Sequence, residues 1–186
     1  NLIVREARST GERMVNLVTS GDDFPERDEF KKALMEAFPL EIHCLLHTSI
    51  HTQKGSRTSI SETILHGKNS ITEILRVKLP RFEETLQLAF DIKPQAFFQP
   101  NPAQAETLYA LALHYADPTA EDIVFDLYCG TGTIGMFFTK IARHVYGIEL
   151  NPSAIESAKQ NASRNNIGNI TFLCGDVGKI ISFVEE

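Results

Sequence analysis

The sequence contains no tryptophan, only three cysteines and no long hydrophobic run. Cys44, Cys129 and Cys174 lie far apart and lack metal-ligand spacing, so we expect neither a disulfide framework nor a metal site. A run of about 18 apolar residues, which a membrane-spanning helix needs, is missing. The charged first residues do not resemble a signal peptide. We therefore expect a cytoplasmic protein without a membrane partner, and nothing in the sequence indicates a protein partner.

An excess of basic charge is also missing. The net charge is -6, and most of it falls in the second half of the chain. This balance argues mildly against a nucleic-acid partner. One stretch of the first half nevertheless gathers basic residues that are able to contact phosphates, namely Lys54, Arg57, Lys68, Arg76, Lys78 and Arg81. From charge alone, an ordinary solvated surface is the better interpretation.

The composition changes near Phe97 and predicts two domains, 1–96 and 97–186. With 42% hydrophobic residues, the chain has enough apolar side chains to build a core. The first part reads as a small α+β domain with antiparallel strands. Its expected elements are a hairpin from 2–7 and 13–19, a helix at 25–38, and strands at 40–51, 63–67, 71–77 and 82–92.

The second part alternates helices and strands, which is typical of a parallel sheet. Asn101-Pro102 and Asn151-Pro152 each have the form of a helix start. The expected order is helix 102–115, strand 124–127, helix 134–141, strand 144–150, helix 153–165, strand 169–174 and a further helix from 178. This is half of a doubly wound, Rossmann-like α/β fold. The first strand would lack a neighbour on one side, so we expect a fragment of a longer protein.

The most informative motif follows the strand that ends at Asp126. Gly130, Gly132 and Gly135 let the backbone turn sharply and approach a ligand without an intervening Cβ. Glu149 ends the next strand, where a carboxylate is placed to accept both hydroxyls of a ribose. Asp176 follows the third strand and could accept an adenine amino group. We therefore expect three carboxylates at one edge of the sheet, around an adenosine-containing cofactor.

The identity of that cofactor depends on Asp126. The glycine spacing fits the dinucleotide fingerprint, which leaves a nicotinamide-dependent oxidoreductase as an alternative. A diphosphate at this turn would lie beside the Asp126 carboxylate, and two such charges repel by about 4 kcal/mol at 4 Å and intermediate dielectric. S-adenosylmethionine carries a sulfonium and an ammonium there instead, which an acidic turn favours. Asp126 could also simply cap the loop backbone, which would not remove its charge.

Four segments carry a resemblance to a known family: Ala96-Phe97-Phe98-Gln99-Pro100-Asn101, Phe125 to Gly132, Tyr146-Gly147-Ile148-Glu149 and Gly175-Asp176. They resemble the bacterial RNA uracil-C5 methyltransferases, which make 5-methyluridine in 23S ribosomal RNA or tRNA. The first half is similar to the family's central, RNA-facing domain. The resemblance implies S-adenosyl-L-methionine as the cofactor and RNA as the partner. A non-catalytic RNA-binding module remains a further alternative.

The resemblance also implies roles for single residues. Gln99 matches a glutamine that contacts the cofactor, and Tyr128 matches the aromatic position of the turn, beside Gly130 and Gly132. Thr133 falls where the family contacts the methionine portion. Glu149 would hold the ribose and Asp176 the adenine, and either Phe97 or Phe98 is expected to pack in the core.

No residue of this sequence is predicted to be catalytic. The family draws its nucleophilic cysteine from a Pro-Pro-Arg segment beyond the next strand, and the base that removes the C5 proton comes later still. Neither is present here, so we expect the chain alone to be inactive. Cys129 lies inside the cofactor turn and is expected to be an inert structural cysteine, and Cys174 to pack in the third strand. The four cysteines that hold an iron–sulfur cluster in some members are absent.

Overall fold

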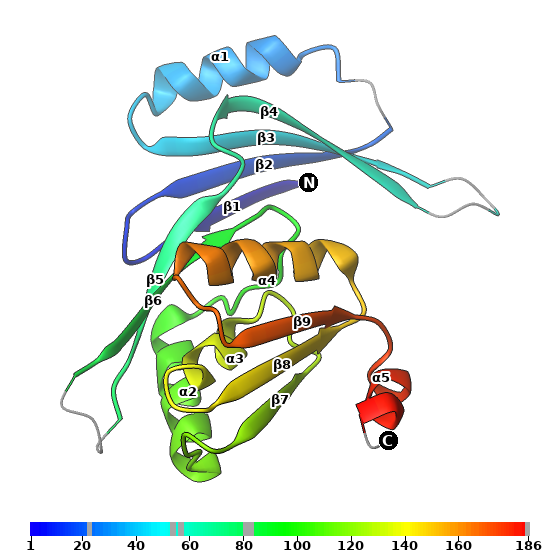
Figure 1. Cartoon of the computed structure of the whole chain (residues 1–186). Helices are drawn as coiled ribbons and strands as arrows, with labels where there is room; N and C mark the ends of the chain where they lie inside the picture. Colours follow the sequence, from blue (N-terminus) through cyan, green and yellow to red (C-terminus); the bar gives the residue numbers. More distant parts are fainter. Residues whose placement is uncertain (22–23, 53–54, 56–57, 80–83, 185–186) are drawn as a thin grey trace. The chain divides into compact units, whose positions relative to one another are not determined.

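The chain folds into two compact units (Figure 1). The computed structural model describes residues 1–186 apart from 22–23, 53–54, 56–57, 80–83 and 185–186. One unit comprises 1–73 and 92–94, and the other comprises 74–91 and 95–186. The architecture is mixed α/β, as expected. None of the helices in the described ranges has the length and apolar character needed to cross a membrane.

The first unit is a four-stranded sheet with one helix. Its strands are β1 (Leu2–Glu6), β2 (Arg13–Ser20), β3 (Ile42–His51) and β4 (Ser59–Gly67), in the order β1-β2-β3-β4. β1 and β4 pair antiparallel with their neighbours, as predicted. β2 and β3 instead run parallel, which corrects the expectation of purely antiparallel pairing. The reason is α1 (Arg27–Ala37), which crosses over between the two strands and returns the chain in the same direction.

The turn of the β1–β2 hairpin is fastened by carboxylates. Glu73, at the start of β5 (Ile71–Val77), accepts hydrogen bonds from the backbone N–H groups of Arg8 at 2.6 Å and Ser9 at 2.9 Å. Glu12 in turn accepts from the backbone N–H of Thr72 at 2.8 Å and pairs with the Lys68 ammonium at 2.6 Å. The backbone N–H groups of Arg8 and Ser9 in the hairpin turn thus have their acceptor in β5, which follows the four-stranded sheet.

The second unit contains a three-stranded parallel sheet. Its elements are α2 (Pro102–Ala116), β7 (Ile123–Leu127), α3 (Thr133–Phe138), β8 (His144–Glu149), α4 (Pro152–Arg164), β9 (Ile170–Cys174) and α5 (Val177–Val184), with strand order β7-β8-β9. The three strands end at the same edge, as predicted (Figure 1). β7 has one paired neighbour among the described strands, and Ile123, Phe125 and Leu127 are exposed.

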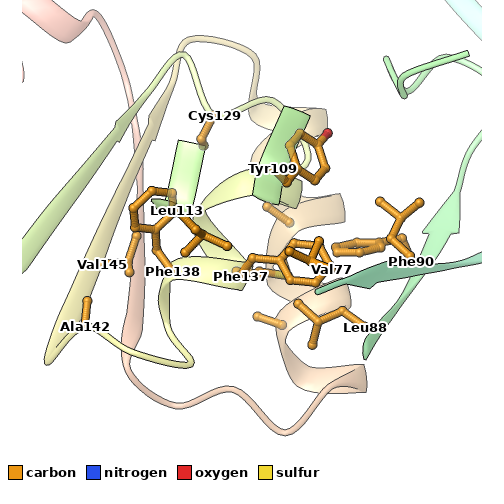
Figure 2. Packing of buried hydrophobic residues seen from close by; sticks show 14 of the residues in the cluster. Val77, Leu88, Phe90, Tyr109, Leu113, Cys129, Phe137, Phe138, Ala142 and Val145 are labelled. Atoms are coloured by element: carbon orange, nitrogen blue, oxygen red, sulfur yellow. The ribbon is translucent and has the colours of Figure 1, made fainter. Parts of the chain in front are cut away.

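A continuous apolar core fills this unit (Figure 2). Phe137 of α3 lies between Tyr109 of α2, at 5.9 Å between ring centroids, and Phe90, at 6.2 Å. Phe90 also contacts Phe98 at 6.0 Å, whereas Phe97 is 72% exposed. Of the two phenylalanines before Gln99, Phe98 is therefore the core residue.

β5 and β6 (Leu86–Ile92) pair with each other as a two-stranded sheet. A domain boundary after residue 96 was expected, yet residues 74–91 of this sheet group with the second unit. Val77, Leu88 and Phe90 are buried in its core, which explains that grouping.

Two asparagines, Asn161 in α4 and Asn165 at its C-cap, reinforce the attachment of β6. Asn165 accepts from the backbone N–H of Ala89 at 2.9 Å and donates to its carbonyl at 2.7 Å. One helical turn earlier, Asn161 makes the same pair of contacts with Asp91, at 2.8 and 3.4 Å. The rise from i to i+4 in a helix is about 6 Å, close to the 6.6–6.8 Å or so between i and i+2 in a strand. The two side-chain amides therefore pair with the backbone N–H and C=O groups of Ala89 and Asp91 as a neighbouring strand would. Arg164 adds an ion pair with the Asp91 side chain at 2.9 Å.

Replacing Asn165 with alanine tests this clamp. Asn165→Ala leaves both backbone groups of Ala89 without these partners, and we expect the free energy of unfolding to fall by about 1–3 kcal/mol in urea titrations. Ser163→Ala, at an exposed position of the same helix, is the matched control and should leave it nearly unchanged. Equal stability of the two variants would contradict the clamp.

Candidate functional site

The site lies at the edge of the second unit's sheet where β7, β8 and β9 end. Asp126 pairs with Gly147 across the β7–β8 ladder, and Glu149 pairs with Cys174 across the β8–β9 ladder. The backbone N–H of Gly175 donates to the carbonyl of Glu149 at 3.0 Å, which ties the turn that carries Asp176 to the end of β8. The parallel ladders thus bring the three predicted carboxylates to one edge.

Backbone conformations that are rare for most residues shape the turn between β7 and α3. Gly130 has φ 55°, Gly132 has φ 75°, and Tyr128, between them and β7, has φ 60°. A tyrosine whose backbone adopts the left-handed conformation is strained by about 1–3 kcal/mol, and such strain is concentrated at functional sites. No residue type in this stretch predicted a left-handed backbone at Tyr128. The Tyr128 side chain is 75% exposed, so its ring faces are open to a ligand.

Glu149 uses one carboxylate oxygen to hold this turn and the other to hold the start of α4. Oε2 accepts from the backbone N–H of Gly130 at 3.2 Å, and Oε1 accepts from the backbone N–H of Asn151 at 2.9 Å. A carboxylate offers about four lone-pair positions, so each oxygen retains acceptor capacity for a ligand. Asn151 then caps α4 through its own side chain, which accepts from the Ser153 N–H at 2.9 Å, as its sequence predicted.

Asp126 holds the other end of the turn. Its Oδ2 accepts from the backbone N–H of Gly135 at 2.9 Å, so the carboxylate does cap the backbone. Burial raises the pKa of Asp126 from its ordinary value of 3.8 to about 6, and the Gly135 hydrogen bond partly offsets that rise. At neutral pH the group is still mainly ionised, so it combines a capping role with a negative charge beside the turn.

Two of the three glycines are required by close packing. A Cβ on Gly135 would come within 2.7 Å of the Asp126 carboxylate, and one on Gly132 within 2.8 Å of the Phe172 ring. A Cβ on Gly130 would meet nothing within 4 Å. The backbone at Gly130 therefore borders open space, which leaves room for a ligand to approach the turn.

The remaining predicted residues have distinct surroundings. Thr133 begins α3, and its Oγ1 lies 3.2 Å from the hydroxyl of Tyr109 on α2. Asp176 is exposed, and its Oδ1 accepts from the Lys179 N–H at 3.1 Å. Gln99 is half-buried in the segment before α2, and within the described residues its side chain has no hydrogen-bond partner. Sequence reasoning missed Tyr109, which looked like one more apolar position of its helix.

The cysteines separate into two kinds. Burial, followed by the charges of Asp126 and Glu149, raises the pKa of the Cys129 thiol to about 12, so this group stays protonated and unreactive at neutral pH. Cys174 is exposed, which corrects the expectation that it packs within its strand. No group of three histidine, cysteine, aspartate or glutamate side chains in the described ranges is arranged to hold a metal ion.

The basic stretch of the sequence does not form one free patch. Lys68 is paired with Glu12, and the guanidinium Nε of Arg76 donates to Gln87 at 3.2 Å. Lys54, Arg57 and Arg81 lie outside the described residues. Charge alone therefore does not define an RNA-binding surface here.

Comparison with known proteins places this site in context. Residues 118–186 match a family described as "Methyltransferase domain". An uncharacterized RNA methyltransferase of Staphylococcus aureus (strain COL) is 36% identical over 181 residues, covering 97% of this chain and 38% of that protein. An uncharacterized RNA methyltransferase of Clostridium tetani (strain Massachusetts / E88) is 39% identical over 182 residues, covering 97% of this chain and 37% of that protein. The chain thus spans less than half the length of these relatives.

The fold is similar to solved structures over nearly the whole chain. The structure of Pyrococcus abyssi tRNA (uracil-54, C5)-methyltransferase in complex with S-adenosyl-L-homocysteine matches with a TM-score of 0.61 and 26% identity, over 94% of this chain and 38% of that one. Trm5b from Pyrococcus abyssi matches with a TM-score of 0.52 and 18% identity, over 95% of this chain and 47% of that one, which shows the fold alone. The second unit therefore has the Rossmann-like fold, and residues 118–186 are similar in sequence to methyltransferase domains.

The raised pKa of Asp126 predicts a pH dependence of stability. Because its folded-state pKa lies above that of the unfolded chain, the folded state binds the extra proton between about pH 4 and pH 6. The stability that this proton contributes is lost as the pH rises through about 6. Relative to Asp126→Asn, the unchanged chain should therefore lose about 1–3 kcal/mol of unfolding free energy between pH 4.5 and 7.5 or so, measured by urea titration at each pH. A difference that does not vary with pH would contradict the shift.

Proposed function

We propose that this chain forms the cofactor-binding part of an S-adenosylmethionine-dependent RNA methyltransferase that modifies C5 of uridine in ribosomal RNA or tRNA. The observation that carries the proposal is the pair of carboxylates, Asp126 and Glu149, which bind the two ends of a left-handed glycine turn. The methyltransferase-domain match over 118–186 supports the reaction class.

The residues present fit S-adenosylmethionine. Glu149 retains acceptor positions for the two ribose hydroxyls. Asp176 uses Oδ1 for the Lys179 N–H, and within the described residues its Oδ2 has no partner, so it suits an adenine amino group. Gly130, Gly132 and Tyr128 form the turn against which the nucleoside would lie, and Thr133 and Gln99 offer a hydroxyl and an amide to the methionine portion. When bound, the cofactor supplies the electrophilic methyl group.

The geometry weighs against the nicotinamide alternative. In a dinucleotide site the glycine turn donates backbone N–H groups to a diphosphate. Here the N–H of Gly135 is already donated to Asp126, and the N–H of Gly130 to Glu149. A diphosphate bound to either of these N–H groups would have to displace a carboxylate and would lie beside it. A sulfonium instead gains from the same negative charge.

The choice of uridine C5 has two supports. The motifs around Gln99 and Asp126 resemble the uracil-C5 methyltransferases, and the similar Pyrococcus abyssi structure is that of a tRNA (uracil-54, C5)-methyltransferase. That chemistry needs a thiolate nucleophile. Burial raises the pKa of Cys129 to about 12, and Cys44 of the first unit is likewise raised to about 12, so neither fits that role. The resemblance places the family's nucleophilic cysteine in a segment beyond these residues, so we propose that the chain binds cofactor and completes no turnover without further residues.

Deletion of the gene that contains this sequence tests the proposed reaction. We expect total RNA from the deletion strain to lose 5-methyluridine at one or more positions, because the enzyme that methylates those positions is absent. Nucleoside mass spectrometry of separated 23S ribosomal RNA and tRNA measures that loss and identifies the RNA.

Reintroduction of the unchanged gene is the control and should restore the nucleoside. Loss of a different methylated nucleoside, with 5-methyluridine intact in both RNA classes, would overturn the uridine C5 assignment while leaving the methyltransferase class in place. Methyl transfer to RNA by the purified chain alone would refute its proposed inactivity.

A further inference from the structure

A buried tyrosine hydroxyl on α2 points to a role beyond packing. Tyr109 is 4% exposed, and its hydroxyl lies 3.2 Å from Oγ1 of Thr133 at the start of α3. Figure 2 shows its ring at the border of the apolar core, where it packs against Phe137 at 5.9 Å. The core thus holds the ring, while the hydroxyl reaches the turn that shapes the site.

The direction of this hydrogen bond follows from burial. Burial raises the pKa of Tyr109, so the phenol remains protonated at neutral pH. A buried O–H needs an acceptor, and Thr133 is the hydrogen-bond partner of this hydroxyl among the described residues. Tyr109 therefore donates and Thr133 accepts, which leaves the Thr133 hydroxyl with its own hydrogen available for a different acceptor.

We propose that Tyr109 is a positioning residue that orients the Thr133 hydroxyl toward the carboxylate of the cofactor's methionine portion. This inference rests on the proposed function, in which Thr133 contacts that portion. A threonine hydroxyl at a half-exposed position otherwise rotates among its staggered conformers. Fixing one of them before the ligand arrives removes an ordering step from binding.

A purely structural role makes a different prediction. The Tyr109 ring fills the core beside Phe137, and its removal would loosen the whole turn and weaken every ligand that binds there. The hydroxyl alone acts on Thr133. Tyr109→Phe keeps the ring and removes only the hydroxyl, so it separates the two roles.

Calorimetric titration with two ligands tests the proposal on the full chain. S-adenosylhomocysteine carries the amino-acid portion, and 5′-methylthioadenosine lacks it. We expect Tyr109→Phe to weaken S-adenosylhomocysteine binding about 3- to 10-fold and to leave 5′-methylthioadenosine binding unchanged. Tyr115→Phe removes an exposed hydroxyl from the same helix and is the matched control, because Tyr115 is 81% exposed. It should alter neither affinity.

Thr133 variants complete the test. Thr133→Ser keeps the hydroxyl and should retain affinity, whereas Thr133→Val should lose as much as Tyr109→Phe or more. The double variant should be no weaker than Thr133→Val, because both changes interrupt one contact. Equal weakening of the two ligands by Tyr109→Phe, no weakening of either, or additive losses in the double variant would overturn the positioning role. Failure of the unchanged chain to bind S-adenosylhomocysteine would overturn the proposed function itself, and this inference with it.

Discussion

The second unit depends on two carboxylates that hold the backbone of one turn. Asp126, near the end of β7, accepts from the N–H of Gly135, and Glu149, at the end of β8, accepts from the N–H of Gly130. No β-sheet ladder supplies acceptors for these two N–H groups, and a buried N–H without an acceptor costs free energy of folding. The glycine turn is thereby fixed by neighbouring strands, and the two carboxylates lie where we propose that a cationic nucleoside binds.

Other parts of the unit follow from this constraint. Gly135 has no room for a Cβ because the Asp126 carboxylate occupies that space, and the Phe172 ring excludes one at Gly132. The end of β8 that carries Glu149 leads directly into α4, and Asn161 of α4 and its C-cap Asn165 fasten β6. β6 in turn precedes the segment that carries Gln99. Hydrogen bonds from side chains to backbone groups thus fasten both the glycine turn and β6.

The sequence predicted much of this arrangement. From residue 97 on, hydrophobic periodicity and the Asn-Pro helix starts gave the elements to within about one residue, except that α3 ends at Phe138 and not at 141. The parallel sheet placed the carboxylates of Asp126, Glu149 and Asp176 at one edge. Periodicity cannot reveal pairing partners, so the parallel β2–β3 ladder and the amide contacts of Asn161 and Asn165 emerged only from the structure. β6 groups with the second unit through the amide contacts of Asn161 and Asn165 and through burial of Leu88 and Phe90 in its core.

The central claim is that Glu149 both organises the turn and binds the ribose of S-adenosylmethionine. Calorimetric titration of Glu149→Ala with S-adenosylhomocysteine tests it most directly, with Glu156→Ala, at an exposed position of α4, as the control. The account predicts affinity at least about 10-fold weaker for Glu149→Ala, since a charge-assisted acceptor is lost, and unchanged affinity for the control. Binding of S-adenosylhomocysteine by Glu149→Ala with undiminished affinity would contradict the account.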